Sequence, residues 1–139
     1  MRFPAYFKPD LETGGYVVTF RDLPEAITQG ETEEECIEMA QDVLIEAMIS
    51  YFDEKKKVPA PSKAKRTERF ITLPPSISSK VLLLNEMISQ QVSPSELARL
   101  MGTNPQEVNR LIDLKHATKI DRIGEALSSL GRTLVLSLV

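Results

Sequence analysis

The chain is poor in cysteine and histidine, since its 139 residues include one of each, Cys36 and His116. A single cysteine excludes an internal disulfide bond, and one cysteine with one histidine excludes a metal site of the ordinary Cys/His type. We therefore expect a fold without disulfide bonds, metal ions or cofactors, in which Cys36 is a small buried residue of a helix.

A long apolar run is also missing. No segment approaches the roughly 20 apolar residues that a membrane-spanning helix needs, and the N-terminal MRFPAYF lacks the basic region and long apolar core of a secretory signal. The composition, 42% hydrophobic and 27% charged, is typical of a soluble globular protein. We expect a cytoplasmic protein with no membrane partner, long enough for one ordinary domain or two small ones.

Basic residues are absent from one long stretch. The net charge of −3 argues against nonspecific nucleic-acid binding by the whole protein. Residues 1–70 hold ten Lys/Arg against fourteen Asp/Glu, whereas residues 71–139 hold seven against six. From Asp22 to Glu54 there are eleven acidic residues and no Lys or Arg, until Lys55 reverses the sign. The stretch is either a surface that attracts a basic partner or a solvated helix face with acids near its N-terminus.

Residues 93–113, SPSELARLMGTNPQEVNRLID, predict two short helices joined by a sharp turn. Each helix begins with a polar cap, a proline and then a glutamate three residues after the cap. The caps are Ser93 and Asn104, and Gly102 ends the first helix where a left-handed residue is needed. The predicted apolar faces are Leu97, Ala98, Leu100 and Met101 in the first helix, and Val108, Leu111, Ile112 and Leu114 in the second.

The spacing within this hairpin is typical of a DNA-binding helix-turn-helix. Such a motif needs a small residue where the helices cross, a glycine in the turn and a branched apolar residue that packs the second helix. Counted from Pro94, these places are taken by Ala98, Gly102 and Val108. The alternative is an ordinary helical hairpin of an interaction domain.

The exposed face of the second helix carries the side chains that we expect to read DNA. Gln106 and Asn109 can bind adenine through two hydrogen bonds, and Arg110 can bind guanine in the same way. Asp113, near the end of the helix, would repel phosphate if it faced the DNA backbone. We expect phosphate contacts from Ser95, Thr103, Asn104, Lys115 and Lys119, although Asn104 is also a cap and its role can be wholly structural.

The first half of the chain reads as strands around a long helix. Alternating patterns predict strands at residues 2–8, 16–20, 26–30 and 69–73, and Pro4 places the first of them at an edge or a bulge. Thr32 and Glu35 form a capping box that opens the longest helix. Residues 55–66, KKKVPAPSKAKR, predict a loop. The helix should pack across the sheet through Cys36, Ile37, Ala40, Val43, Leu44, Ala47, Met48 and Tyr51.

The second half reads as helices followed by one apolar segment. Residues 76–91 predict a helix that braces the hairpin, and a later helix begins near Lys119, capped by Thr118, and ends at Gly131. Residues 133–139, TLVLSLV, favour a strand that has no partner in this half. We expect this strand to pair with its copy in a homodimer or higher homo-oligomer. The alternative is pairing with the strand at 69–73 of the same chain.

The order of these parts closely resembles the HicB antitoxins of bacterial type II toxin–antitoxin pairs, over nearly the whole length. The segments GGYVVTFRDLPEAITQGET and HATKID carry the resemblance. It implies an α+β chain of two domains: residues 1–75, a partial ribonuclease H-like β-β-β-α-β domain with a loop at 55–67, and residues 76–139, an all-α Cro/C1-type helix-turn-helix domain with a dimerising strand. The first would mask a HicA toxin, a small basic ribonuclease that cleaves mRNA, and the second would bind operator DNA and repress the operon.

Two other functions compete with this interpretation. A ribonuclease H-type enzyme would need clustered carboxylates to bind metal ions, but Asp10, Asp22 and Glu25 lie at turns, and turn chemistry explains them. His116 has no nucleophile beside it, and we expect it to contact phosphate or hold a loop. We therefore expect no catalytic residue and no enzymatic activity. The second competitor is a transcription regulator whose N-terminal domain senses a small ligand.

Overall fold

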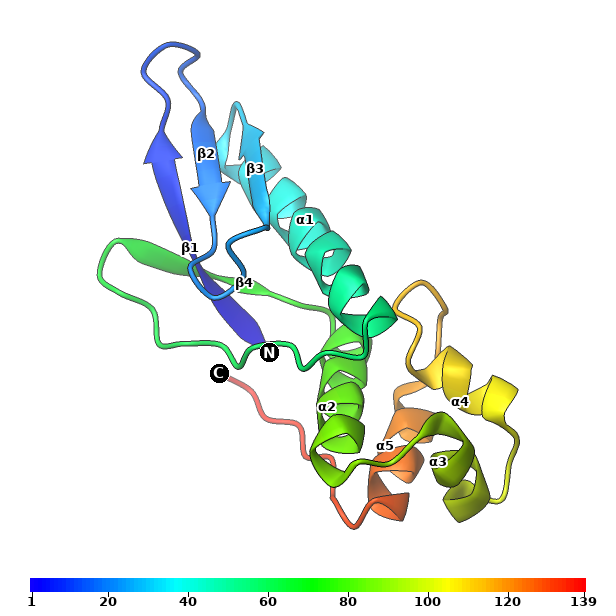
Figure 1. The fold of residues 1–139 in the computed structure, drawn as a ribbon. Coiled ribbons are helices and arrows are strands. Elements are labelled where there is room, and N and C mark those ends of the chain that lie inside the picture. Colours follow the sequence, from blue (N-terminus) through cyan, green and yellow to red (C-terminus); the bar gives the residue numbers. More distant parts are fainter. The chain divides into compact units, whose positions relative to one another are not determined.

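A computed structural model describes all residues, 1–139, as an α+β protein with one antiparallel sheet and five helices (Figure 1). The α+β prediction is confirmed. The chain forms two compact units: residues 1–50 with 59–74, the sheet unit, and residues 51–58 with 75–139, the helical unit. None of the helices is long and apolar enough to span a bilayer.

The sheet has four strands in the order β3-β2-β1-β4, all antiparallel. They are β1 (Arg2–Pro9), β2 (Tyr16–Thr19), β3 (Ile27–Gly30) and β4 (Glu68–Thr72), close to the predicted strands. The expectation that Pro4 marks an edge or a bulge is wrong, because β1 lies between β2 and β4. Pro4 pairs across the ladder with Phe70, whereas the pairing with β2 begins only at Tyr6. No ladder bond therefore needs the missing N–H of Pro4.

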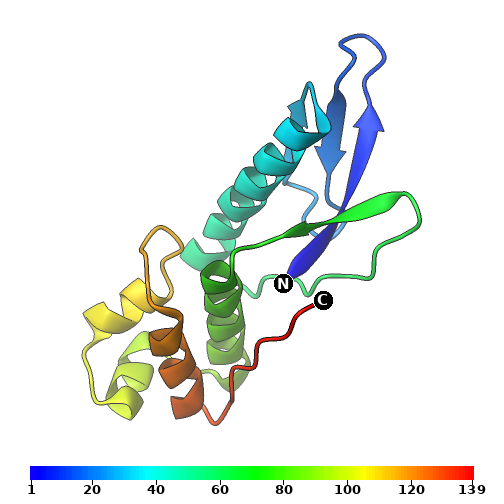
Figure 2. The same cartoon turned by 180° about the vertical axis from the view of Figure 1, so that it is seen from behind.

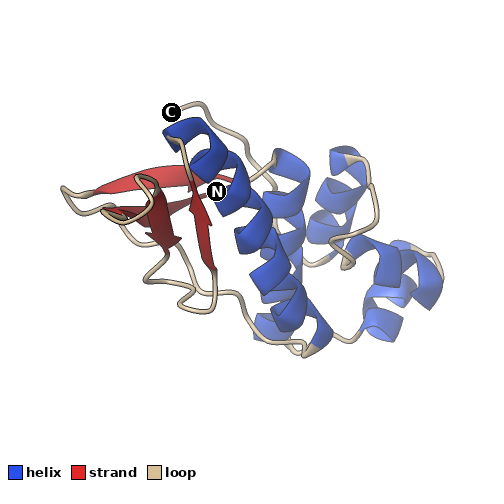
Figure 3. Cartoon of the chain, turned by 90° about the horizontal axis from the view of Figure 1, so that it is seen from above, coloured by secondary structure: helices blue, strands red, loops and turns tan.

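The long helix α1 (Glu33–Asp53) covers one face of the sheet (Figure 3). Its predicted cap is present, because the Thr32 hydroxyl accepts a hydrogen bond from the Glu35 N–H at 3.1 Å. The buried positions recur every four residues and are Cys36, Ala40, Leu44, Met48 and Phe52. Ile37 was expected on this face but is 45% exposed, because the sheet covers only a narrow stripe of the helix.

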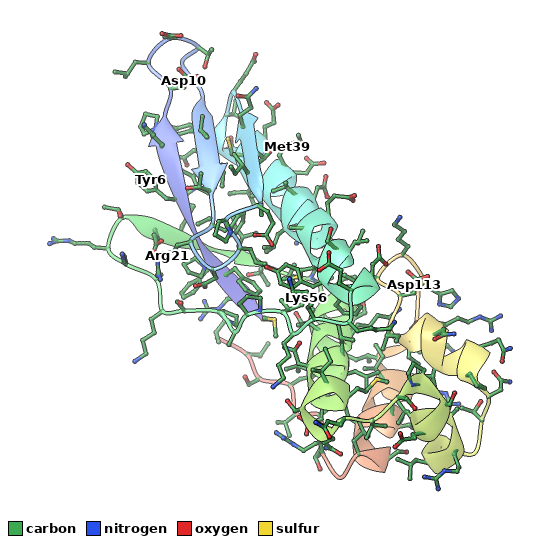
Figure 4. The ribbon with its side chains drawn as sticks, in the orientation of Figure 1. Tyr6, Asp10, Arg21, Met39, Lys56 and Asp113 are labelled. Atoms are coloured by element: carbon green, nitrogen blue, oxygen red, sulfur yellow. The ribbon has the colours of Figure 1, made fainter.

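Residues 59–66, inside the predicted loop, have no regular structure but are tied to the sheet unit by side chains. The guanidinium of Arg21, labelled in Figure 4, donates to both carboxylate oxygens of Glu68 at 2.8 Å and to the Lys63 carbonyl at 2.7 Å. The Asp22 carboxylate accepts from the N–H and the hydroxyl of Ser62, at 2.8 and 2.6 Å. The loop is therefore anchored by groups that are distant in the sequence.

The helical unit contains α2 (Pro75–Gln90), α3 (Pro94–Met101), α4 (Pro105–Leu111) and α5 (Ile120–Ser129), best separated in Figure 2. Both predicted caps of the hairpin are present: the Ser93 hydroxyl accepts from the Glu96 N–H at 3.1 Å, and the Asn104 side chain accepts from the Glu107 N–H at 2.9 Å. The core of this unit comprises Phe52, Val58, Val81, Leu83, Leu84, Met87, Leu97, Ala98, Val108, Leu111, Ile112, Leu114, Ile123, Ala126, Leu127 and Leu130.

Two local predictions in this unit are wrong. Leu100 is 47% exposed rather than buried, because at 100° per residue it lies about 110° from the centre of the face shared by Leu97 and Ala98. The helix α5 is capped at Lys119 without a side-chain hydrogen bond. The Thr118 hydroxyl, expected to make that cap, instead lies 3.3 Å from the His116 Nδ1 atom.

The C-terminal segment, residues 133–139, forms no strand in this chain, although a strand was predicted there. The strand β4 pairs with β1 alone, so the alternative of pairing within the chain is not observed. Leu134 is half-buried, whereas the other apolar side chains of the segment are exposed, from 65% for Leu136 to 78% for Val135 and almost completely for Leu138 and Val139. In a single chain, most of this apolar segment is therefore exposed to water.

Candidate functional site

The helical hairpin α3–α4 brings the motif residues to the places that the spacing predicted. Ala98 and Val108 are buried between the helices, with 2% and 0% of their surfaces exposed. Gly102 has a φ of 70°, in the left-handed region that favours glycine, and its N–H is bonded to the Ala98 and Arg99 carbonyls. Three residues, Gly102 to Asn104, separate α3 from α4. The connection is short enough to hold the two helices at a sharp angle.

The eight residues predicted to contact DNA lie at the start of α3, in the turn, on α4 and in the loop after α4. Seven of them are exposed, and Thr103 is half-buried in the turn. The exposed ones are Ser95, Asn104, Gln106, Asn109, Arg110, Lys115 and Lys119. The hairpin thus presents hydroxyl, amide and cationic groups to solvent, which are the groups that contact bases and phosphates in DNA.

Arg110 is only loosely held by the protein. Its Nη1 atom lies 3.7 Å from a carboxylate oxygen of Glu107, and its side chain is 61% exposed. Glu107 also accepts a hydrogen bond of 3.4 Å from Arg122, which makes a shorter one of 2.6 Å with Glu125. These carboxylates, Glu125 above all, raise the pKa of Arg122. Arg122 therefore competes for Glu107 and leaves the Arg110 guanidinium available to a ligand.

A buried lysine, which the sequence analysis missed, holds the end of α4. Lys80 on α2 is 1% exposed, and its Nζ atom donates to the carbonyls of Arg110, Asp113 and His116 at 3.1, 2.7 and 2.5 Å. The last carbonyls of a helix lack partners within it and carry its negative dipole end. Burial lowers the pKa of Lys80, and the charge of Asp113 opposes this shift. The amino group ties the last turn of α4 and the loop after it to α2.

A signal for this lysine is present in the sequence. Lys80, Leu84 and Met87 recur at spacings of four and three, so they share one face of α2, and all three are buried. The sequence predicted only a bracing helix at residues 76–91, without a role for Lys80. A charged residue on an apolar face of a helix indicates a buried polar contact.

The acidic stretch forms the exposed side of α1. Glu33 is joined to Arg69 at 3.5 Å, and the other acids of the first half of the helix remain exposed, namely Glu34, Glu35, Glu38 and Asp42. Asp10 serves a turn, as predicted: hydrogen bonds from Thr13 and the Glu12 N–H lower its pKa. No three His, Cys, Asp or Glu side chains are grouped so as to hold a metal ion.

This geometry defines the class: an α+β protein in which an acidic helix covers a small antiparallel sheet, and a separate helical unit exposes a capped hairpin with polar and basic side chains. Comparisons with known proteins agree with this class and refine it. A family model for the HicB-like antitoxin of bacterial toxin-antitoxin systems matches residues 2–82.

Curated relatives match over nearly the whole chain. "Antitoxin HicB 2" of Photorhabdus laumondii is 49% identical over 136 residues, which is 98% of this chain and 95% of the relative. "Antitoxin HicB" of Escherichia coli K12 is 45% identical over 139 residues, all of both chains. "Antitoxin HicB" of Pseudomonas fluorescens is 32% identical over 91% of this chain and 87% of the relative. The chain belongs to the HicB-like antitoxin family, which confirms the resemblance found in the sequence.

Proposed function

We propose that this chain binds and neutralises a HicA-type toxin and represses its own operon by sequence-specific DNA binding, in the bacterial cytoplasm and without catalysis of its own. The proposal rests on family membership and on one observation, the doubly capped hairpin with an exposed polar face. In this proposal residues 1–75 are a partial ribonuclease H-like domain that binds the toxin, and residues 76–139 are a helix-turn-helix domain that binds operator DNA.

We assign base contacts to Gln106, Asn109 and Arg110, which are exposed along one short helix. Phosphate contacts are assigned to Ser95, Thr103, Asn104, Lys115 and Lys119, which surround that helix in the chain. Lys80 supports them indirectly, since it binds three carbonyls at the end of α4. A guanidinium that makes two hydrogen bonds to guanine typically contributes about 1–3 kcal/mol of discrimination.

Arg110→Ala tests the DNA part. We expect it to weaken operator binding about tenfold or more and to leave toxin neutralisation unchanged, because Arg110 lies in the helical unit. Arg66→Ala is the matched control, since it removes the same charge from an exposed position in the sheet unit. Binding is measured by fluorescence anisotropy at fixed salt. Equal losses of operator binding and neutralisation would contradict the assignment.

Asn104 needs a separate test because it has two candidate roles. Its side-chain oxygen caps α4 by accepting from the Glu107 N–H, and its amide is free to meet a phosphate. Asn104→Ser keeps a capping oxygen and removes the amide, whereas Asn104→Ala removes both and costs about 1 kcal/mol of stability. If the serine variant binds the operator as well as the unchanged chain does, the residue acts only as a cap.

We also propose that residues 133–139 pair with the same segment of a second chain. Backbone groups in an apolar segment need hydrogen-bond partners, and the exposed Val135 and Leu138 would be covered by the pairing. The pairing would place two hairpins on a two-fold operator. Deleting residues 133–139 should lower the mass in solution, measured by light scattering. An unchanged mass would refute this pairing.

The toxin part is tested by co-purification with the product of the adjacent open reading frame, followed by growth tests of that partner alone and with this chain. Growth arrest that this chain relieves supports the proposal. A partner that neither binds nor is toxic would favour the remaining rival, a transcription regulator that senses a small ligand.

A further inference from the structure

The outer edge of β4 is an unpaired strand edge in the sheet unit. The strand order β3-β2-β1-β4 leaves one side of β4 without a neighbour. The N–H of Leu73 donates to the Met1 carbonyl, so Leu73 points its backbone towards β1. Backbone groups alternate in direction along an antiparallel ladder, and Phe70 and Thr72 therefore point theirs to the outer edge. Such an edge is a template for an added strand.

One of these outward groups is already satisfied from α1. The Gln41 side-chain amide donates to the Thr72 carbonyl at 2.6 Å. This contact closes the end of the β4 edge and leaves the backbone N–H and carbonyl of Phe70 without a neighbouring strand. Phe70 faces Pro4 in a pair without hydrogen bonds, so its backbone groups also have no partner on β1. The open part of the edge is centred on Phe70.

A groove of about 360 Å³ lies beside this open part. It is lined by Glu34, Ile37, Glu38, Gln41, Phe70, Ile71 and Thr72, from α1 and β4. Two large apolar side chains in it are unusually accessible, Ile37 at 45% and Phe70 at 38%. An apolar centre that contains an aromatic residue, with a polar rim, is typical of a protein–protein contact rather than of bulk surface.

The rim of the groove is acidic on its helix side. Glu34 and Glu38 are exposed there without an ion pair, and the chain has no Lys or Arg from Asp22 to Glu54. The guanidinium of Arg2 lies 4.2 Å from the centre of the Phe70 ring but is not among the groove residues. Complementary charge calls for an occupant with Lys or Arg side chains.

The opposite edge of the sheet is a poorer site. A second groove of about 360 Å³ beside β3 is lined by Asp10, Glu31, Glu35 and Met39 among others. Its one exposed large apolar side chain is Met39, labelled in Figure 4, at 41%. This groove has no exposed aromatic side chain. The two grooves have the same volume, so the side chains that line them decide, and these favour the groove beside β4 as a protein-binding site.

We propose that the β4 edge and the groove between α1 and β4 are the toxin-docking surface, taken by an extended basic segment of the toxin that pairs with Phe70 and sets its Lys or Arg side chains against Glu34 and Glu38. This inference deepens the proposed function and rests on it. An apolar side chain of the same segment packs on the exposed Ile37.

Two matched substitutions on α1 test the surface. Ile37→Lys and Met39→Lys lie two residues apart on one helix, replace side chains of similar exposure, and add the same charge. Ile37 lines the β4 groove and Met39 lines the β3 groove. The probe is the purified toxin from the adjacent gene, titrated onto each full-length variant by calorimetry, with thermal unfolding recorded to check each fold.

We expect Ile37→Lys to raise the dissociation constant at least tenfold and Met39→Lys to change it less than twofold. A second pair, Phe70→Ser against Tyr6→Ser, should show the same contrast, since Tyr6 is equally exposed but lies outside the groove. Equal effects within both pairs, or a larger effect of Met39→Lys, would overturn the docking surface while leaving the proposed function standing. Failure of the unchanged chain to bind the toxin would overturn both.

Discussion

The clearest polar contacts inside the sheet unit and those inside the helical hairpin differ in how far apart their partners lie in the sequence. In the sheet unit, Arg21 reaches Glu68 and Asp22 reaches Ser62, across 47 and 40 residues of sequence. In the helical unit, Ser93 and Asn104 each bond to an N–H only three residues away. A contact between residues close in the sequence can be predicted from the local sequence pattern. A contact between distant residues cannot, because it depends on which strands and loops the fold brings together.

Long-range contacts also occur in the helical unit, where Gln90 donates to the Leu130 carbonyl and Arg132 to Glu86. Lys80 makes the most of them, because it joins α2 to three backbone carbonyls 30 to 36 residues further on. No local pattern names those carbonyls as its partners. Three experiments would break or sharpen the contrast between the units.

The largest effect is expected for Lys80→Met. The substitution keeps the length of the side chain but removes a buried donor from three carbonyls, of which those of Arg110 and Asp113 still accept from backbone N–H groups. We expect a loss of about 3 kcal/mol in the free energy of unfolding, because all three bonds come from a charged group. Urea unfolding followed by circular dichroism measures it. Ser89→Met, at an exposed position of the same helix, is the control and should be nearly neutral. A loss below about 1 kcal/mol would mean that water replaces the amino group.

Two glycines give a middle-sized effect for opposite reasons. A Cβ at Gly15 would collide with the Gly30 carbonyl oxygen on β3, and we expect Gly15→Ala to cost about 2 kcal/mol. A Cβ at Gly102 would meet nothing within 4 Å, but the φ of 70° at this residue is strained for alanine. We therefore expect Gly102→Ala to lower the free energy of unfolding by about 1 kcal/mol.

Asparagine separates the two causes, because it tolerates the left-handed region. Gly102→Asn should recover most of the loss seen in thermal unfolding, whereas Gly15→Asn should recover none. If asparagine also recovered stability at position 15, the need for glycine there would come from the backbone conformation and not from the collision with Gly30.

The smallest effect is expected from pH. Hydrogen bonds from Arg21 and then from the Lys65 N–H lower the pKa of Glu68 below its ordinary 4.5. Because the folded pKa lies below the unfolded one, the contact stabilises the fold above pH 4.5, and this stability is lost as the pH falls through the folded pKa. Glu68→Gln should flatten the pH dependence of the unfolding midpoint between neutral and acidic pH. If the pH dependence of the unfolding midpoint did not change, it would arise from other carboxylates.

Much of the fold was predictable from the sequence. All four strands and all five helices lie close to the predicted ranges, because periodicity and capping residues act over a few neighbouring positions. The strand predicted at 133–139 is missing, since a strand needs a partner that this chain does not supply. The residues expected to contact DNA belong to a hairpin with a strong local pattern, and seven of the eight are exposed, but their contact with DNA stays a prediction.

The groove beside β4 was not predictable in the same way. Ile37 was read as a core residue and Phe70 as part of an ordinary strand, and only the strand order brings them to one unpaired edge. Likewise, Pro4 was placed at an edge, because a sequence pattern does not specify where the pairing with β2 stops.

What the sequence alone determined is local: where helices and strands begin and end, the turn at Gly102, and the family through its two marked segments. The tertiary structure decided which groups meet, from the Lys80 amino group at the end of α4 to the open edge at Phe70. The reason is physical, because a cap or a turn satisfies its own backbone within one helical turn, whereas a buried cation or a strand edge finds its partners only after distant parts of the chain have packed.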